Sequence, residues 1–215
     1  MFKIGILWSW TVGKTLAVGL HSLGYDTMIG SRSVSTLEER KQEQWFPGRV
    51  GSFEEVGEFG DVIILAVKWS AAESALSMTG KEHLKWKVIL DTTNPIDDLP
   101  PEDGVLQFFT GTNFSLMERL QSLFPLARFV KCFSCIGADT MIQPHFEEGT
   151  PTMFICGNDG EAKQIATEIL TTCGFEAADM GSAKAAGSIE SLCILRCIPW
   201  FTKGERNHAF KLLKK

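Results

Sequence analysis

The stretch Lys3-Ile4-Gly5-Ile6-Leu7-Trp8-Ser9-Trp10-Thr11-Val12-Gly13 decides the fold of this chain. Residues 2–7 have the character of a buried parallel strand, and residues 11–23 have the pattern of a helix. A dinucleotide-binding loop carries the pattern G-x-G-x-x-G between such a strand and helix. Only the third glycine, Gly13, is present, because Trp8 and Trp10 stand at the first two glycine positions. The sequence therefore predicts a nucleotide-binding fold with an altered loop.

The two tryptophans lead to three hypotheses about this loop. In the intact motif the first glycine makes the tight turn and the second lets the backbone approach a pyrophosphate, so an indole at Trp10 is expected to occupy that space. In the first hypothesis both indoles turn aside and the cofactor binds. In the second, the chain is a cofactor-impaired or engineered version of the scaffold with a structural or regulatory role. In the third, the indoles stack on another aromatic ligand.

Strand and helix patterns alternate along the rest of the chain, which predicts βαβ units. Strands are expected at residues 25–30, 61–67, 88–91, 128–133, 152–156 and 175–179, and helices at residues 36–44, 53–59, 69–78, 113–124, 160–173, 183–198 and 207–213. We predict an α/β fold, a Rossmann-type doubly wound, mostly parallel sheet with a small C-terminal helical portion. Residues 1–135 are predicted to form the nucleotide-binding domain and residues 136–215 a C-terminal extension of strands and helices.

Composition excludes several classes of partner. The chain has 215 residues, a net charge of -5 and a pI near 5.4, and no cluster of Lys and Arg is interleaved with aromatic residues, so nucleic acid is not expected as a partner. No apolar stretch approaches the roughly 20 residues of a membrane span, and no signal peptide is recognisable. We expect a cytoplasmic protein without a membrane partner.

The cysteines and histidines do not predict a metal site. Cys132 and Cys135 have the spacing of a redox or zinc motif, and Cys193 and Cys197 would share one helix face. Cysteine in a reduced compartment also packs as a small buried hydrophobe, which is the interpretation we favour. The four histidines lack metal-ligand spacing.

Several segments together resemble the family of deazaflavin-dependent NADP reductases and their bacterial NADP-oxidoreductase relatives, over essentially the whole chain. These segments are residues 3–7, 12–16, 29–32, 91–95 (Asp-Thr-Thr-Asn-Pro), 151–159 and 207–211. The resemblance implies NADP(H) as cofactor, hydride transfer to a small-molecule acceptor such as a deazaflavin or flavin, and a homodimer. It also implies that the C-terminal extension completes the acceptor pocket and the dimer contacts. A ferric or quinone acceptor stays open, because a fold does not fix a substrate.

Ser31 and Arg32 follow the second strand, where an NAD-specific site places an acidic residue against the ribose 2′-hydroxyl. Arg32 can instead donate charge-assisted hydrogen bonds to a 2′-phosphate, and Ser31 can add a hydroxyl donor. This chemistry favours NADP over NAD. The alternative is a solvated arginine in a turn.

The remaining site residues follow from their places at strand ends and from the resemblance. Cofactor contacts are expected from Ser9, Trp10, Thr11, Val12, Val67, Trp69, Asn94 and Pro95, and the acceptor pocket from Phe133, Ser134, Ile136 and Gly137. For Trp69 the alternative is a packing anchor at a helix start, and for Asn94 an Asn-Pro turn. Hydride transfer between two bound rings depends on approach and orientation, so no catalytic residue is predicted.

Overall fold

The structure, a computed structural model, describes residues 1–9, 11–35, 37, 46–111 and 113–213. Its strands are β1 (Lys3–Trp8), β2 (Asp26–Gly30), β3 (Arg49–Gly51), β4 (Val62–Ala66), β5 (Val88–Asp91), β6 (Arg128–Lys131), β7 (Thr152–Gly157) and β8 (Glu176–Asp179). In this part of the chain they form one sheet of order β3-β2-β1-β4-β5-β6-β7-β8. Every neighbouring pair is parallel except β6 and β7, which are antiparallel. The predicted Rossmann-type class is therefore confirmed.

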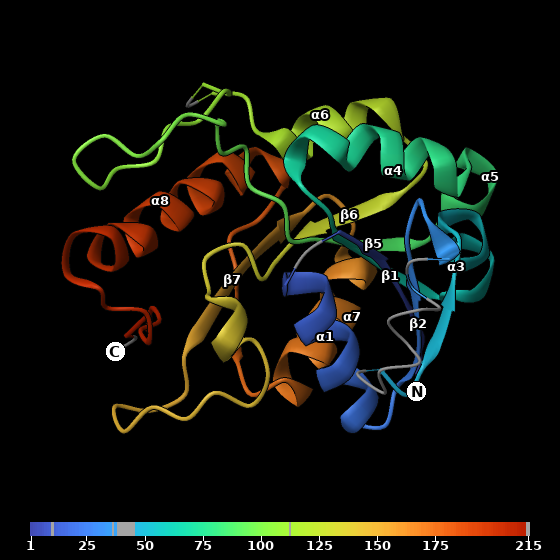
Figure 1. The fold of residues 1–215 in the computed structure, drawn as a ribbon, viewed down its shortest axis with the longest axis horizontal. Coiled ribbons are helices and arrows are strands. Elements are labelled where there is room, and N and C mark those ends of the chain that lie inside the picture. Colours follow the sequence, from blue (N-terminus) through green and yellow to red (C-terminus); the bar gives the residue numbers. More distant parts are fainter. Residues whose placement is uncertain (10, 36, 38–45, 112, 214–215) are drawn as a thin grey trace.

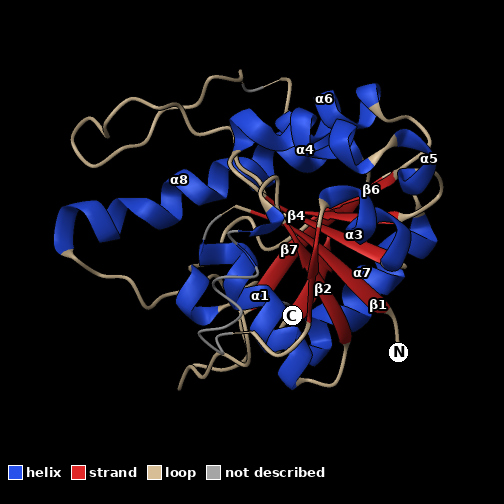
Figure 2. Cartoon of the chain, turned by 45° about the vertical axis from the view of Figure 1, so that its right-hand side comes forward, coloured by secondary structure: helices blue, strands red, loops and turns tan. Residues whose placement is uncertain are grey.

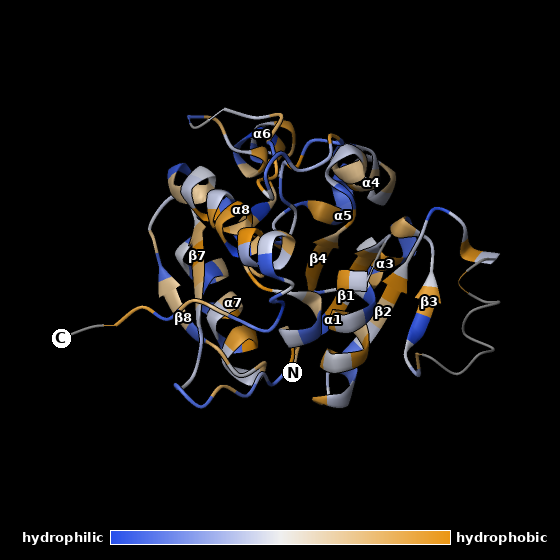
Figure 3. Ribbon diagram, turned by 60° about the vertical axis from the view of Figure 1, so that its left-hand side comes forward, coloured by the Kyte–Doolittle hydropathy of each residue, from blue (hydrophilic) through white to orange (hydrophobic). Residues whose placement is uncertain are grey.

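Helices cover both faces of the sheet (Figures 1 and 2). They are α1 (Thr11–Ser22), α3 (Phe53–Phe59), α4 (Ala72–Thr79), α5 (Lys81–Leu84), α6 (Leu116–Leu123), α7 (Gly160–Thr172) and α8 (Ala186–Lys203). One face packs against α1 and α7, and the other against α3, α4, α6 and the first turns of α8. Both layers bury apolar side chains, which explains why the central strands are apolar on both sides (Figure 3).

Capping residues decide where two of the helices begin. Ser115 accepts a hydrogen bond from the Glu118 backbone N–H at 3.0 Å, and the Glu118 carboxylate accepts one from the Ser115 N–H at 3.1 Å. This capping box starts α6 at Leu116, three residues after the predicted start. Ser52 and Glu55 form the same arrangement at the start of α3.

The predicted helix at residues 207–213 is wrong, because residues 204–213 contain no helix. The Thr152 N–H donates to the Phe210 carbonyl at 2.8 Å, and the Leu212 N–H donates to Thr152 Oγ1 at 3.0 Å. Lys211 Nζ also donates to the Thr150 carbonyl at 2.8 Å. These bonds run to the start of β7 rather than along a helix, so the segment is an extended strap beside that strand. Leu213, which the helical pattern placed on the apolar face, is 84% exposed.

Other expectations have mixed outcomes. The strand β3 and the short helix α5 were not predicted, and the predicted helix at residues 36–44 lies outside the described residues except for Leu37, which is buried. The division at residue 135 stays a prediction, and the sheet continues across it through the pairing of β6 with β7. No helix of the described ranges is long and apolar enough to span a membrane.

Candidate functional site

A cavity of about 370 Å³ lies at the carboxyl edge of the sheet. The strand order reverses its direction between β1 and β4, and residues at the end of β4 line the cavity. Ligands of doubly wound folds bind at this switch point. Its lining comes from the start of α1, from the ends of β4 and β5, and from the loops that follow, and it comprises Val12, Ala66, Val67, Lys68, Trp69, Thr92, Thr93, Asn94, Ile96, Asp97 and Asp98. Four predicted cofactor residues, Val12, Val67, Trp69 and Asn94, therefore meet in one cavity.

The loop after β1 is tied to the end of β4 beside this cavity. The Ser9 N–H donates to the Ala66 carbonyl at 3.3 Å, and Ser9 Oγ accepts a hydrogen bond from the Lys68 N–H at 3.0 Å. Thr11 is exposed at the first position of α1. Trp10, the residue at the second glycine position, lies outside the described residues.

Trp8 turns into the core beneath α1 and is 8% exposed. Its indole packs against Gly13, where an added Cβ would come within 2.6 Å of Trp8 Cδ1 and 3.3 Å of the Ala66 methyl. Trp8 belongs to the same apolar cluster as Ile4 and Ile6, because alternate residues of a strand face the same side. Gly13 therefore makes room for the indole of Trp8.

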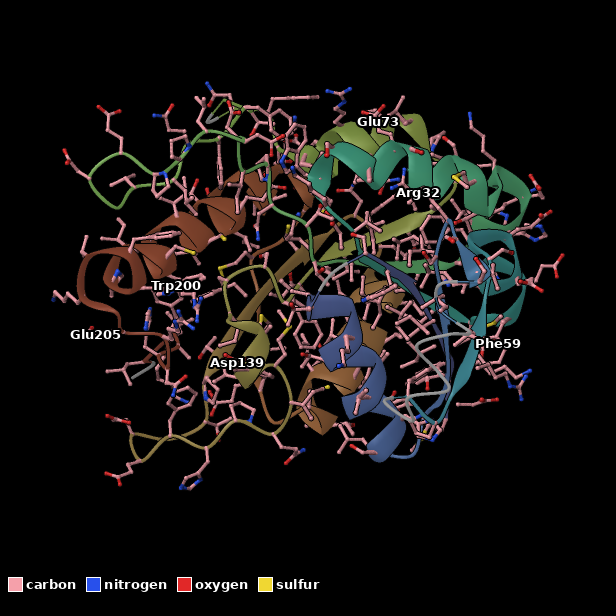
Figure 4. All side chains as sticks on the ribbon, in the orientation of Figure 1. Arg32, Phe59, Glu73, Asp139, Trp200 and Glu205 are labelled. Carbon is pink, nitrogen blue, oxygen red and sulfur yellow. The ribbon has the colours of Figure 1, made fainter. Side chains whose placement is uncertain are left out.

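Ser31 and Arg32 lie directly after β2, at the same edge of the sheet as the cavity. The side chain of Arg32 is exposed and is labelled in Figure 4. Ser31 is half-buried, and its N–H donates to the Gly51 carbonyl at 3.2 Å. The turn continues with a hydrogen bond from the Ser33 N–H to Ser31 Oγ at 3.3 Å.

Aromatic and charged side chains form the outer wall of the cavity. The ring of Trp69 stacks on Phe109, with ring centroids 4.1 Å apart and an interplanar angle of 29°. Lys68 pairs with Asp98 across the opening. The packing role considered for Trp69 is therefore present, and its ring also lines the cavity.

Asn94 is held in one orientation by the neighbouring loop. Its Nδ2 donates to the Ser134 carbonyl at 2.9 Å, which places Oδ1 on the other side of the amide. Asn94 Oδ1 and Ser134 Oγ are both buried, and neither has a hydrogen-bond partner among the residues described. Buried polar atoms of this kind are rare in native structures and point to a missing donor or acceptor. Pro95, the next residue, is buried.

The predicted acceptor residues lie farther inside. Phe133 is 1% exposed, has a φ of 54° and makes an edge-to-face contact with Phe175 at 6.0 Å. Ile136 is 8% exposed, and Gly137 backs onto the guanidinium of Arg196, whose Nη2 would lie 2.2 Å from an added Cβ. The carbonyl of Ser134 accepts a hydrogen bond from Asn94, which lines the cavity. The acceptor assignment of all four stays a prediction.

A buried charge cluster that was not predicted lies next to the loop that lines the cavity. Asp91, Lys131 and Glu190 are each at most 1% exposed, and Lys131 Nζ lies 2.7 Å from Asp91 Oδ2 and 2.9 Å from Glu190 Oε1. Burial alone would lower the pKa of Lys131, but the two carboxylates raise that pKa above its usual value. The available signal was a lysine and an aspartate at the ends of two apolar strands.

The cysteines are free thiols, and all six are buried. Cys193 and Cys197 share a face of α8 as predicted, and a hydrogen bond from the Cys193 thiol lowers the pKa of Cys197 to about 7 although burial opposes the shift. Burial raises the pKa of Cys135 to about 11. A surface group that the sequence spacing did not reveal, Glu54, Glu58 and His83, brings three possible metal ligands within 4.8 Å of one another.

Comparisons with known proteins show which family and which structures the chain resembles. Residues 3–95 match the family described as NADP oxidoreductase, coenzyme F420-dependent. The whole chain superimposes on the whole of a protein from Arthrobacter sp. FB24 described as an F420-dependent NADP-reductase, with a TM-score of 0.90 and 28% identity. A hypothetical protein from Sinorhizobium meliloti, SMa0349, shares the fold over 100% of this chain and 97% of its own, with a TM-score of 0.73 and 20% identity.

Curated relatives are longer than this chain. The metalloreductase STEAP3 of Rattus norvegicus is 32% identical over 199 residues, which are 92% of this chain and 37% of that protein. The metalloreductase STEAP2 of Homo sapiens is 27% identical over 194 residues, or 88% of this chain and 35% of its own. The chain thus spans little more than a third of these relatives. Its residues 3–95 thus match the NADP oxidoreductase, coenzyme F420-dependent family, which confirms the resemblance predicted from the sequence motifs.

Proposed function

We propose that this chain binds NADP(H) along the carboxyl edge of its sheet and passes a hydride between NADPH and a deazaflavin or flavin-like ring. The observation that carries the proposal is the amide of Asn94, whose orientation at the cavity is fixed while its Oδ1 is buried without a partner in the described ranges. The carboxamide of a nicotinamide supplies the N–H donor that this oxygen needs.

The residues of the cavity fit the cofactor on its nicotinamide side. Val12 of the first turn of α1 lines the cavity, so the free backbone N–H groups at this helix start are close to it. The wall is mainly apolar and includes the stacked ring of Trp69, which suits a flat ring. On the adenosine side, Arg32 and Ser31 would hold a 2′-phosphate by charge-assisted hydrogen bonds.

Trp8 supports retained binding rather than a blocked site. Its indole is buried beneath α1 and does not line the cavity. Of the three hypotheses for the loop, we therefore favour the one in which the cofactor binds.

The chemistry asks for orientation rather than for acid or base. NADPH, when bound, supplies the hydride. The chain's own contribution is to hold the nicotinamide through Asn94, to flank it with Trp69 and to keep the approach to it largely apolar. We propose a flavin-type acceptor because the family description names a deazaflavin coenzyme. The curated relatives are metalloreductases, so a metal ion is the alternative final acceptor.

Calorimetric titration with NADPH and NADH tests this proposal. We expect micromolar binding of NADPH and binding of NADH weaker by at least about ten-fold, which is about 1.4 kcal/mol. Asn94→Leu removes the amide while keeping the branching and the number of side-chain heavy atoms, and it should weaken NADPH binding by a similar factor, while Asn113→Leu, at an exposed asparagine outside the cavity, should not. Wild-type protein that binds NADPH no tighter than millimolar would overturn the proposal.

The acceptor is tested by NADPH oxidation in the presence of FMN, a deazaflavin or ferric citrate. Faster turnover with a ring acceptor than with the ferric chelate is expected. The predicted homodimer and cytoplasmic location are likewise proposals, the first of which light scattering of the purified chain would test.

A further inference from the structure

The buried charge cluster of Asp91, Lys131 and Glu190 connects two neighbouring strands, β5 and β6, with the helix α8. Asp91 and Lys131 are direct neighbours across β5 and β6, and Glu190 reaches them from α8. The ammonium of Lys131 makes three contacts, to Asp91 Oδ2, to Glu190 Oε1 and to the Thr93 carbonyl at 2.7 Å. All three of its N–H donors are therefore used, and the cluster carries a net charge of one negative unit.

The cavity side of the cluster grips a single residue, Thr93. Asp91 Oδ1 accepts hydrogen bonds from the Thr93 N–H at 2.9 Å and from Thr93 Oγ1 at 2.6 Å, and Lys131 donates to the Thr93 carbonyl. Charged partners thus hold both backbone polar groups and the side chain of Thr93. Thr93 lines the cavity and directly precedes Asn94.

The opposite side of the cluster holds a helix. Glu190 Oε2 accepts from the Leu116 N–H and Oε1 from the Met117 N–H, both at 3.2 Å, at the start of α6. Neither Leu116 nor Met117 lines the cavity. The two carboxylates therefore have separate tasks, since Asp91 holds the cavity loop and Glu190 holds α6.

Stability alone is a weak reason for three buried charges. A buried ion pair is expensive to desolvate, and well-packed apolar residues of similar volume are often as stabilising. Charge-assisted hydrogen bonds do restrict geometry strongly, because they are short and directional. At this place the restricted geometry is that of the loop that carries Asn94.

We propose that Asp91 and Lys131 are positioning residues, which lock Thr93 so that the amide of Asn94 meets the nicotinamide carboxamide of the cofactor. This inference rests on the proposed function. The adenosine half of the cofactor would be held at the other end of the edge, near Arg32, and the lock does not reach it. Loss of the lock should therefore weaken binding of the nicotinamide half only.

Two variants of equal charge test the inference. Asp91→Asn and Glu190→Gln each remove one negative charge from the same cluster and leave it neutral. In Asp91→Asn an NH2 group must face either the Thr93 N–H or the Lys131 ammonium, which are both donors, so one bond of the lock is lost. Glu190→Gln disturbs the start of α6 and leaves the bonds between Asp91 and Thr93 in place. Thermal unfolding of both variants shows whether they are folded.

Binding of NADPH and of 2′,5′-ADP, which lacks the nicotinamide, is measured by calorimetry for each protein. We expect Asp91→Asn to weaken NADPH binding by about ten-fold and 2′,5′-ADP binding by less than about two-fold, whereas Glu190→Gln changes each by less than about two-fold. Equal effects of the two variants on the ratio of these affinities would overturn the inference. If Asp91→Asn does not fold, Thr93→Val is used in its place, because it removes one hydrogen bond to Asp91 and leaves all charges present. An unchanged NADPH affinity of Thr93→Val would also overturn the inference.

The same measurements distinguish failure of the proposed function from failure of the positioning role. Wild-type protein that binds neither compound contradicts the proposed function, and the positioning role falls with it. Wild-type protein that binds both, with Asp91→Asn indistinguishable from it, contradicts the positioning role alone.

Discussion

Restoring the first glycine of the loop, Trp8→Gly, should weaken the fold rather than repair it. The indole of Trp8 is 8% exposed and fills the space between the end of β1 and the start of α1. Removing it leaves a cavity in the larger of the two apolar layers and introduces a flexible backbone position at the end of a strand.

The size of the loss follows from the buried surface. A buried tryptophan removes about 200 Å² from water, which at about 25 cal/mol per Å² corresponds to about 5 kcal/mol. Partial burial in the unfolded chain reduces this figure, and large-to-small substitutions of tryptophan cost about 3–5 kcal/mol. Glycine adds up to about 1 kcal/mol of backbone entropy. We expect the free energy of unfolding to fall by about 4 kcal/mol, a large part of the about 5–15 kcal/mol of a typical domain.

A double-mutant cycle with Gly13→Ala tests directly whether the indole of Trp8 packs against Gly13. In the wild type the new methyl group would lie 2.6 Å from Trp8 Cδ1, so overpacking should destabilise the protein by about 1–3 kcal/mol. In the Trp8→Gly background the indole is gone and the Ala66 methyl, 3.3 Å away, is the near neighbour that remains, so alanine should stabilise α1 by about 0.5–1 kcal/mol because glycine is a poor helix former. The same substitution is therefore expected to change sign.

Urea unfolding followed by far-ultraviolet circular dichroism measures all four proteins without relying on tryptophan fluorescence. The slope of the free energy against urea concentration should stay constant, so that differences in midpoint report stability. Effects of Gly13→Ala that agree within about 0.5 kcal/mol in both backgrounds would refute the packing of Trp8 on Gly13.

Three further expectations concern charge. Arg32→Gln should weaken NADPH binding by about ten-fold or more and leave NADH binding unchanged in calorimetry, because a charge-assisted bond contributes about 1.5–3 kcal/mol, and equal losses would argue against a 2′-phosphate site. Burial raises the pKa of Glu118, but hydrogen bonds from Lys184 and Ser115 outweigh it and lower this pKa below its usual value of 4.5. The charged form of Glu118 therefore stabilises the fold above pH 4.5, and this contribution is lost as the pH falls through the lowered pKa. Glu118→Gln should therefore shift the urea midpoint at pH 7 but not in strong acid, and an equal shift at both would contradict this. The Cys197 thiol should titrate with a pKa of about 7 in ultraviolet thiolate absorbance, and Cys193→Ala should raise that pKa, since the bond from Cys193 is its largest cause.

The sequence predicted the elements whose residue pattern is determined locally. The apolar runs at residues 4–7 and 62–66 are typical of buried parallel strands, and the sheet follows from them. The pattern at residues 207–213 is too short to separate helix from strand, and the bonds to Thr152 that decide it come from a segment about 60 residues away. The three-residue strand β3 is too short to show any period.

The candidate site likewise contains residues that could be predicted from the sequence and residues that could not. Val12, Val67, Trp69 and Asn94 could be found because parallel strands bring their carboxyl ends to one edge. The partnership of Asp91, Lys131 and Glu190 spans 40 and 59 residues, and no local pattern encodes such distances. The alternation of side chains along a strand could have predicted that Trp8 faces the core with Ile4 and Ile6. The glycine motif instead suggested a role for Trp8 in the loop.

The reversed strand β7 gives the two halves of the molecule opposite electric polarity. α1 begins at the carboxyl edge, beside the cavity, whereas α7 follows β7 and begins at the opposite edge. There Arg128, the first residue of β6, contacts Asp159 and Glu161 at the start of α7. The partial positive charge of that helix start is thus met by the chain's own acids, on the far side of the sheet from the cavity. Phosphates at the cavity would therefore meet the positive start of α1, while the start of α7 is already neutralised on the opposite edge of the sheet.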